Sequence, residues 1–182
     1  MHRILRTLLV FILLAAAGFA ADADFFAETK KKAEAGDATA QYSLGFMYNL
    51  GIGVPKDDKE AVKWSRLAAD QGIARAQYNL GNMYYKGEGV PKDFAEAVKW
   101  YRKAAEQGFA YAQSNLGLMY VRGESVPKDL VQAHVWWNIA GANGHENAKK
   151  NLAIIEKEMT SEQKAEAMAL ARELFAKLPP KK

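Results

Sequence analysis

Apolar residues recur at helical spacing along the chain, and glycine and proline interrupt them at regular intervals. In residues 73–108 a first run of apolar positions at spacings of three and four residues predicts a helix with one apolar face. Gly87 ends that run, and Pro91 cannot continue a helix. A second helical run follows and ends at Gly108. The segment therefore predicts a helix, a turn and a second helix, whose inward residues are Ala76, Leu80, Met83, Tyr84, Ala97, Trp100, Ala104 and Ala105.

This helix–turn–helix pattern repeats every 36 residues without a gap. The units cover residues 37–72, 73–108 and 109–144, and the first two are identical at 24 of 36 positions. A fourth, degenerate copy begins at His145. A fixed period of this length is typical of helical hairpins that stack on one another. We therefore predict an all-α solenoid of stacked helix-turn-helix repeats with a 36-residue period.

Several residues occupy the same place in every unit, and each suggests a structural role. An acidic or polar pair spaced by three residues predicts capping boxes at Asp57 and Glu60, Asp93 and Glu96, Asp129 and Gln132, and Thr160 and Gln163. Glycine inside a helix destabilises it by roughly 1 kcal/mol relative to alanine. Its recurrence at Gly45, Gly81 and Gly117 therefore predicts close approach to the alanines of the paired helix. The tryptophans Trp64, Trp100 and Trp136 are expected in the core and between repeats.

The N-terminal residues have the pattern of a secretory signal peptide. Two arginines precede a short apolar run, and small residues then allow cleavage after Ala20 or Ala23. The apolar run is shorter than the roughly 20 residues that span a bilayer, although an uncleaved anchor remains an alternative. We expect residues 1–20 to be the signal peptide and the protein to be periplasmic or secreted, without a membrane attachment after cleavage.

The repeats are flanked by segments that we interpret as caps. Residues 21–36 predict an N-terminal capping helix, residues 37–158 the solenoid, and residues 159–182 a C-terminal capping helix and tail. The apolar stripe that we expect to cover the last hairpin consists of Ala165, Met168, Ala169, Leu174 and Phe175.

The order of motifs within each unit resembles a known family. LG-x-MY, G-x-G-V-x-K-D, A-x-x-W and AA-x-x-G follow one another in register, as in the Sel-one-like repeat (SLR) family, a relative of the tetratricopeptide repeat. The resemblance covers residues 36–158 well. It implies a right-handed α-solenoid that acts as a scaffold for other proteins. One secreted branch pairs cysteines within each repeat, and some of its members are described as binding or hydrolysing β-lactams; this chain has no cysteine.

Composition limits the chemistry that the chain offers. The absence of cysteine excludes disulfides and thiolate metal sites. The net charge of +4 comes from basic residues interspersed with acidic ones, whereas a nucleic-acid surface needs a basic stripe. Two serine–lysine pairs, Ser125 with Lys128 and Ser161 with Lys164, have the spacing of penicillin-binding enzymes but lack the companion motifs.

Two further patterns resemble functional sites, but the residues around them do not support that interpretation. The loop GIGVPK follows a helix rather than a strand and contains a proline, so we do not interpret it as a phosphate loop. His134 and His145 are not spaced as metal ligands on one helical turn, so packing or solvent exposure is the better interpretation. We therefore predict no catalytic, cofactor or metal site.

The positions where the repeats disagree are the candidates for binding. Framework positions must repeat to preserve the stacking, whereas a position that contacts a ligand need not. In the first helix of each unit the differences lie on one face, which lines a concave groove by resemblance to tetratricopeptide arrays. Unselected drift at exposed positions is the alternative. We call this set the variable stripe; it comprises Thr39, Tyr42, Phe46, Asn49, Leu50, Arg75, Tyr78, Asn82, Tyr85, Lys86, Tyr111, Ser114, Leu118, Val121 and Arg122.

The sequence thus favours an exported scaffold or adaptor without catalysis. It is expected to be monomeric and to bind a protein or peptide partner in the envelope or outside the cell. Two alternatives remain: a small periplasmic hydrolase acting on β-lactam or peptidoglycan fragments, and a structural protein that stacks end to end.

Overall fold

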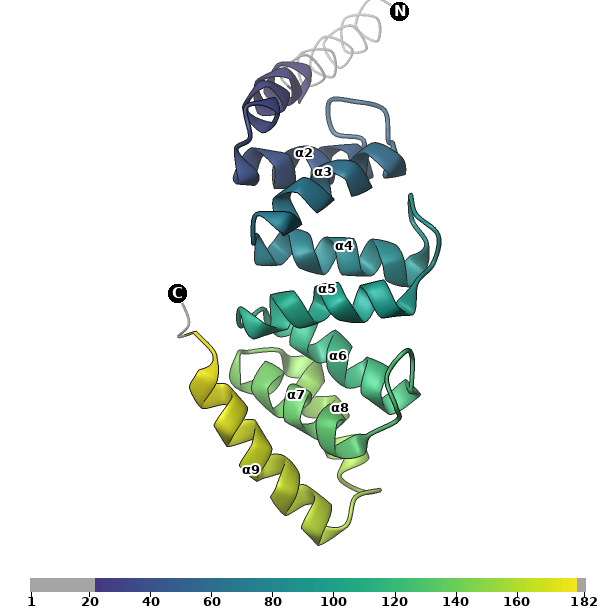
Figure 1. Ribbon diagram of the computed structural model, residues 1–182, viewed down its shortest axis with the longest axis vertical. Helices are drawn as coiled ribbons and strands as arrows, with labels where there is room; N and C mark the ends of the chain where they lie inside the picture. Colours follow the sequence, from purple (N-terminus) through teal and green to yellow (C-terminus); the bar gives the residue numbers. More distant parts are fainter. Residues whose placement is uncertain (1–21, 180–182) are drawn as a thin grey trace, which may run out of the picture.

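The protein is an all-α stack of helical hairpins, as the sequence predicts (Figure 1). The computed structural model describes residues 22–179, and the expected signal peptide over residues 1–20 lies outside this range. A helix over residues 22–34 precedes the repeats. The repeats and the C-terminal segment then form α2 (Ala38–Leu50), α3 (Asp58–Asp70), α4 (Ala74–Lys86), α5 (Phe94–Glu106), α6 (Ala110–Arg122), α7 (Leu130–Ala142), α8 (Glu146–Ile155) and α9 (Ser161–Lys177).

Turn chemistry fixes the length of each helix. The first helix of the second repeat ends at Gly87, which adopts a φ of 78° and donates its N–H to the carbonyl of Met83. A left-handed residue at this place satisfies one of the free carbonyls of the last turn, and glycine does so without steric cost. The second helix begins at Asp93, whose side chain accepts from the N–H groups of Ala95 and Glu96. The predicted turn and helix boundaries are therefore confirmed.

The reciprocal half of the capping boxes forms only at the C-terminal helix. Thr160 and Gln163 each accept a hydrogen bond from the other's backbone. In the first two repeats the glutamate bonds to a tryptophan instead of to the N-cap backbone. The Glu60 carboxylate accepts from the indole of Trp64 at 3.0 Å, and the Glu96 carboxylate accepts from that of Trp100 at 3.1 Å. The prediction was wrong here because a mostly buried indole N–H needs an acceptor, and the glutamate one turn earlier supplies it.

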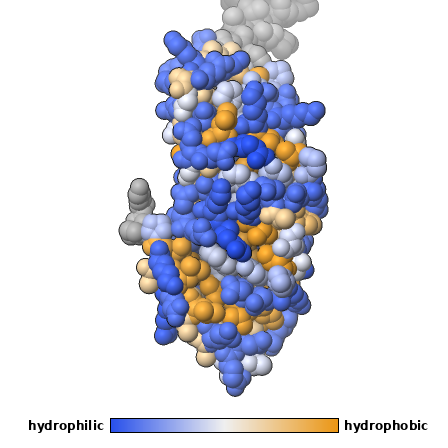
Figure 2. All heavy atoms as spheres, viewed as in Figure 1, coloured by the Kyte–Doolittle hydropathy of each residue, from blue (hydrophilic) through white to orange (hydrophobic). Residues whose placement is uncertain are grey.

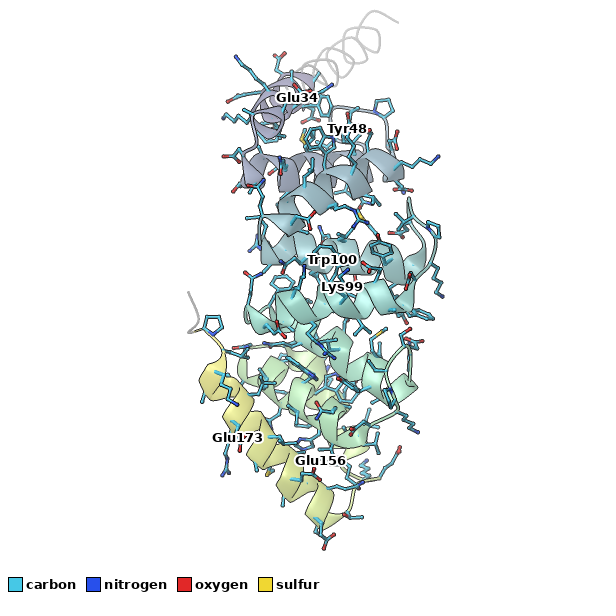
Figure 3. The ribbon with its side chains drawn as sticks, viewed as in Figure 1. Glu34, Tyr48, Lys99, Trp100, Glu156 and Glu173 are labelled. Atoms are coloured by element: carbon cyan, nitrogen blue, oxygen red, sulfur yellow. The ribbon has the colours of Figure 1, made fainter. Side chains whose placement is uncertain are left out.

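The tryptophans that recur in each repeat join consecutive repeats. Trp100 projects from α5 toward α4 (Figure 3) and packs into a cluster with Leu80 and Met83 of α4 and with residues of α3. Trp64 and Trp136 occupy the equivalent places in the neighbouring clusters, and all three are at least 93% buried. The expected role in the core and between repeats is confirmed.

The interior glycines do mark a close approach, but in the second and third repeats it is to a ring rather than to alanines, and only Gly45 has an alanine atom, the carbonyl oxygen of Ala61, among its three nearest. A Cβ atom at Gly81 would lie 2.6 Å from the ring of Tyr101, and one at Gly117 would lie 2.5 Å from the indole of Trp137. At Gly45 the nearest atoms belong to Ser65, at 2.7 Å for the hydroxyl oxygen. The side chain that packs closely against each glycine belongs to the residue directly after the recurring tryptophan. This residue is different in every repeat.

A ladder of buried amides connects the repeats, and the sequence reasoning missed it. Gln77 donates to the carbonyl of Ala69 at 3.1 Å and accepts from Gln107 at 2.8 Å. Gln41 and Gln113 make the same pair of bonds one repeat earlier and one repeat later. The signal was a glutamine repeated at the 36-residue period in the middle of an apolar face.

The C-terminal helix covers the last hairpin with a different face from the expected one. α9 lies against α7 along the side of the stack (Figure 1), and Ala167 and Ala171 are its buried residues. Leu170, Leu174 and Leu178 pack beside them, whereas the expected Ala165, Met168, Ala169 and Phe175 are exposed. Alanine lets the helix axes approach closely, so it lies at the centre of the contact. Figure 2 shows hydrophobic residues gathered around α7 and α9 on an otherwise mostly hydrophilic face.

Candidate functional site

The variable stripe forms one surface, because its residues on successive first helices lie beside one another. The Tyr78 and Tyr111 rings are 6.1 Å apart between centroids. Arg122 of α6 donates to the hydroxyl of Tyr85 of α4 at 2.5 Å. Residues that are 33 to 37 positions apart in the sequence therefore line the same face of the stack.

Solvent reaches most of this surface to different degrees. The most exposed apolar residues on it are Tyr111 at 57%, Leu50 at 56% and Phe46 at 42%. The exposed members are Thr39, Phe46, Leu50, Arg75, Lys86, Tyr111 and Arg122, and the half-buried members are Tyr42, Asn49, Tyr78, Asn82, Tyr85, Leu118 and Val121.

Ser114 does not belong to this accessible surface, contrary to the expectation. It is 7% exposed, and its carbonyl accepts from the indole N–H of Trp137 at 2.9 Å. The first two repeats have a tyrosine at this position, whereas the third has a serine next to the large Trp137 ring. The change from tyrosine to serine at this position therefore belongs to the packing of the core and not to the accessible surface.

Some half-buried members of the stripe also support the fold. The Tyr85 ring packs 5.2 Å from that of Phe94 and borders the core cluster around Tyr101. Tyr78 contacts Tyr101 and Phe109 in the same way. A substitution at Tyr85 therefore changes both the surface and the packing beneath it.

Two hollows lie at equivalent places on the stripe, each between consecutive first helices. One is about 120 Å³, lies between α2 and α4, and has Gly45 and Ser65 among its lining residues. Phe46, Asn49 and Lys86 contribute to its wall and rim. The other is about 180 Å³, lies between α4 and α6, and is lined by residues that include Tyr101, Tyr85 and Leu118.

The polar groups between the hollows form a small network. Tyr101 donates its hydroxyl to the Asn82 side-chain oxygen at 2.8 Å, and the Asn115 amide approaches the same oxygen at 3.4 Å. Burial raises the pKa of the Tyr101 phenol well above its ordinary value, so the hydroxyl stays protonated and remains a donor. The network holds Asn82 at the boundary of both hollows.

A cluster of aromatic rings lies at the end of the stripe in the third repeat. Tyr111 meets the His145 ring edge to face at 4.9 Å, and the two residues border a third hollow of about 310 Å³. The His145 side chain also accepts from the N–H of Ala148, which makes it the N-cap of α8. Its role in packing and capping agrees with the sequence interpretation.

The candidate catalytic residues occupy structural positions. Ser125 has a φ of 56°, the left-handed conformation that Gly53 and Gly89 adopt at the same place in the other repeats. Ser161 is the first residue of α9, directly after its N-cap. His134 is buried and lies 3.1 Å from the Glu156 carboxylate.

The described residues offer neither a metal cluster nor a membrane-spanning helix. Within residues 22–179 no three His, Asp or Glu side chains gather closely enough to hold a metal ion. In the same range no helix has the length and apolar character needed to cross a membrane.

Comparisons with solved structures agree with the architecture. The chain is similar to c5321, a protective antigen of uropathogenic Escherichia coli strains that displays an SLR fold, with 42% identity and a TM-score of 0.78 over 84% of this chain and 33% of that one. It is also similar to a Sel1 repeat protein from Oxalobacter formigenes, with 35% identity and a TM-score of 0.65 over 74% of this chain and 60% of that one. The chain thus spans less than two thirds of either relative. No curated protein matches.

The family model for the Sel1 repeat matches three consecutive segments, residues 38–73, 74–109 and 110–145. These segments coincide with the units read from the 36-residue period, displaced by one residue. The match extends over more than half of the chain and agrees with the helical hairpins seen in the structure. The chain belongs to the Sel1 repeat family.

Proposed function

We propose that this protein is an exported adaptor that binds a segment of another protein through the variable stripe of α2, α4 and α6. Sel1 repeats generally act as protein-interaction scaffolds. The observation that carries the proposal is the contrast between a continuous stripe and its changing residues. Stripe residues of successive first helices lie side by side, yet the equivalent positions of the repeats carry different aromatic, amide and basic groups.

The chemistry of the stripe suits a protein partner. Exposed Phe46, Leu50 and Tyr111 offer apolar contact area, and Arg75 and Arg122 add cationic groups. Aromatic and arginine side chains carry much of the energy in protein interfaces. Basic residues on and off the stripe are paired with acidic ones, as in Arg122 with Glu124 and Lys99 with Glu96. This interspersed charge gives little support for nucleic-acid binding.

Export is the second part of the proposal. It rests on the basic start, the short apolar run and the small residues before Asp24. The partner is then an envelope or extracellular protein, and the adaptor acts as a monomer. Sequencing the N-terminus of the mature protein from a periplasmic or secreted fraction tests this part, and intact Met1 in a cytosolic fraction would contradict it.

A pulldown with matched surface variants tests the binding face. The stripe variant carries Leu50→Ser and Tyr111→Ser, and the control carries Leu67→Ser on α3, where the leucine is 41% exposed. We expect partners captured from the native envelope to be lost with the stripe variant and kept with the control. Capture that is equal with both variants, or lost with both, would contradict the proposed face.

A further inference from the structure

The hollow beside Tyr111 is larger than the two hollows between the first helices. It has a volume of about 310 Å³ and lies between the start of α6 and the turn from α7 to α8. This volume reaches the lower end of the range for small-molecule sites, which is roughly 300–1,000 Å³. The Tyr111 ring lines one side, and the polar side chains that line the hollow are Asn143, His145, Glu146 and Asn147.

Three of these polar residues are not part of the repeating framework. Residues 145–147 read HEN, whereas residues 109–111 read FAY at the same place in the preceding repeat. There the rings of Phe109 and Tyr111 pack against Tyr78, with centroids 5.2 and 6.1 Å away. The junction after the third repeat therefore carries hydrogen-bonding groups where the preceding junction has apolar packing.

The Tyr111 ring is held in place and is still accessible. Tyr111 is 57% exposed, and its ring centroid lies 5.8 Å from that of Phe109 and 4.9 Å from that of His145. A ring that its neighbours already hold loses little conformational freedom when a ligand covers it. The negative face of its π-system attracts C–H groups that are polarised by neighbouring oxygens.

The polar side chains offer both donors and acceptors. The Nδ1 atom of His145 accepts from the N–H of Ala148 at 3.1 Å, so the neutral ring carries its proton on Nε2 and can donate it. Asn143 donates its amide to Gln113 at 3.0 Å, which leaves its side-chain oxygen as an acceptor. Asn147 is exposed and has an amide that can both donate and accept.

The charge beside the hollow favours a neutral ligand. Glu146 pairs with Lys149 at 2.7 Å, and this hydrogen bond lowers the pKa of the Glu146 carboxyl, which is therefore ionised at neutral pH. The carboxylate repels an anion, and its pairing with the ammonium group weakens its attraction for a cation. A purely apolar ligand would remove water from the carboxylate and the amides without replacing the lost hydrogen bonds.

We propose that this hollow binds a pyranose residue of a neutral glycan. Such a residue has an apolar C–H face, which covers the Tyr111 ring, and a rim of hydroxyls. The hydroxyls donate to the oxygens of Glu146 and Asn143 and accept from His145 and Asn147. The site lies at the end of the variable stripe but does not depend on the binding of a protein, so it goes beyond the proposed function.

Titration of the protein with methyl glycosides of glucose, galactose, mannose and N-acetylglucosamine tests the site. We expect at least one glycoside to give saturable amide shifts at Tyr111, Gly144 and Asn147, with a dissociation constant of the order of millimolar, as suits a ligand of about 13 to 16 heavy atoms. Sorbitol, an open-chain polyol, has no ring face and should bind roughly two- to tenfold more weakly. No saturable shifts with any glycoside, or equal binding of sorbitol, would overturn the proposal.

Variants of Tyr111 test the stacking contact. Tyr111→Phe keeps the ring and should bind the tightest glycoside within about twofold of the parent, whereas Tyr111→Ala should bind it about tenfold more weakly. Since Tyr111 is 57% exposed, we expect both variants to fold, and a thermal melt checks this. Equal binding by the two folded variants would overturn the proposal.

Asn147 provides a test of the hydrogen-bonding wall. Asn147→Ala removes an exposed amide that lines the hollow and should weaken glycoside binding roughly two- to tenfold. Asn138→Ala removes the same group from α7, away from the residues that line the hollow, and should leave binding unchanged. Unchanged binding by Asn147→Ala, or an equal loss in Asn138→Ala, would overturn the assignment.

The inference and the proposed function can fail separately. Leu50→Ser changes the other end of the stripe and should weaken partner capture while glycoside binding stays unchanged. If no glycoside binds but Asn147→Ala loses the captured partner, the hollow binds protein and the inference is wrong. If glycosides bind with the expected pattern of variants but no partner depends on the stripe, the inference is supported and the proposed function fails.

Discussion

The seam between repeats and the face of the first helices follow opposite rules. Across the seam the same contacts recur: Gln41, Gln77 and Gln113 each donate to a carbonyl of the preceding helix, at 3.0 to 3.1 Å. On the variable stripe, Arg122 bonds to Tyr85 and Tyr111 meets His145 edge to face, and the equivalent positions of the other repeats hold different residues.

This difference separates what the stack requires from what it tolerates. A solenoid is stable because each repeat buries its neighbour, so the residues of the seam are constrained in every copy. The exposed residues of the face are free to vary, because their substitution leaves the seam intact, whereas half-buried members such as Tyr85 also pack against the core. The contrast predicts that stability and binding depend on different residues, and substitutions can test this from the largest expected effect to the smallest.

Removing a seam tryptophan should have the largest effect on stability. We expect Trp100→Ala to lower the free energy of unfolding by about 3–5 kcal/mol, because a large buried side chain leaves a cavity between α3, α4 and α5. Urea unfolding followed by circular dichroism measures the change. The control is Lys99→Ala on the exposed side of the same helix (Figure 3). A similar loss in both variants would contradict the seam role of Trp100.

Crowding the glycine of the second repeat should have the next largest effect. Gly81→Val would place its side chain against the Tyr101 ring, and overpacking of this kind typically lowers stability by about 1–3 kcal/mol. The urea midpoint reports the change, and Arg75→Val places the same side chain at an exposed position of α4. An unchanged midpoint for Gly81→Val would show that the ring moves aside without cost.

Much of this seam was predictable from one sequence. The 36-residue period fixed the hairpins, and Asp93 and Gly87 marked the helix ends, because these signals are local and recur in register. The partner of each glycine was not predictable, since it depends on how deeply α5 or α7 sits against the preceding helix. The predicted buried face of α9 was wrong for the same reason. Ala167 and Ala171 are buried because the axis of α9 comes close to the preceding helices, and the apolar periodicity of the sequence does not reveal this.

The candidate site was predictable in outline only. Variation between repeats located the stripe, and the structure places fourteen of its fifteen residues at exposed or half-buried positions. It could not distinguish Ser114, where the variation compensates for the Trp137 ring in the core. The hollow lined by Gly45 and Ser65 was also not predictable, because it forms where residues of two different repeats come together.

Breaking one link of the amide ladder should have a moderate effect. In Gln77→Leu the Ala69 carbonyl loses its donor and Gln107 loses its acceptor, which should lower stability by about 1–2 kcal/mol, since an unsatisfied buried polar group usually costs about 1–3 kcal/mol. The exposed partner in the ladder, Gln71, offers the control Gln71→Leu with a smaller loss. Thermal melts of both variants measure the difference. Equal melting temperatures of Gln77→Leu and Gln71→Leu would show that the buried bonds add no stability beyond that of the exposed ones.

Substitution on the exposed part of the stripe should have the smallest effect on stability and the largest on binding. Leu50 and Tyr111 are 56% and 57% exposed, so Leu50→Ser and Tyr111→Ser should each change the free energy of unfolding by no more than about 0.5 kcal/mol. Binding of the partner should weaken at least tenfold in the double variant, because exposed apolar and aromatic groups are the ones that a partner can bury. Leu67→Ser removes a similarly exposed leucine from α3 and should change neither quantity. Melting temperature and affinity are measured together on the two single variants, the double variant and the Leu67→Ser control. A large loss of stability in the stripe variants would place these residues in the framework, and unchanged affinity would mean that the differences between repeats on this face are drift.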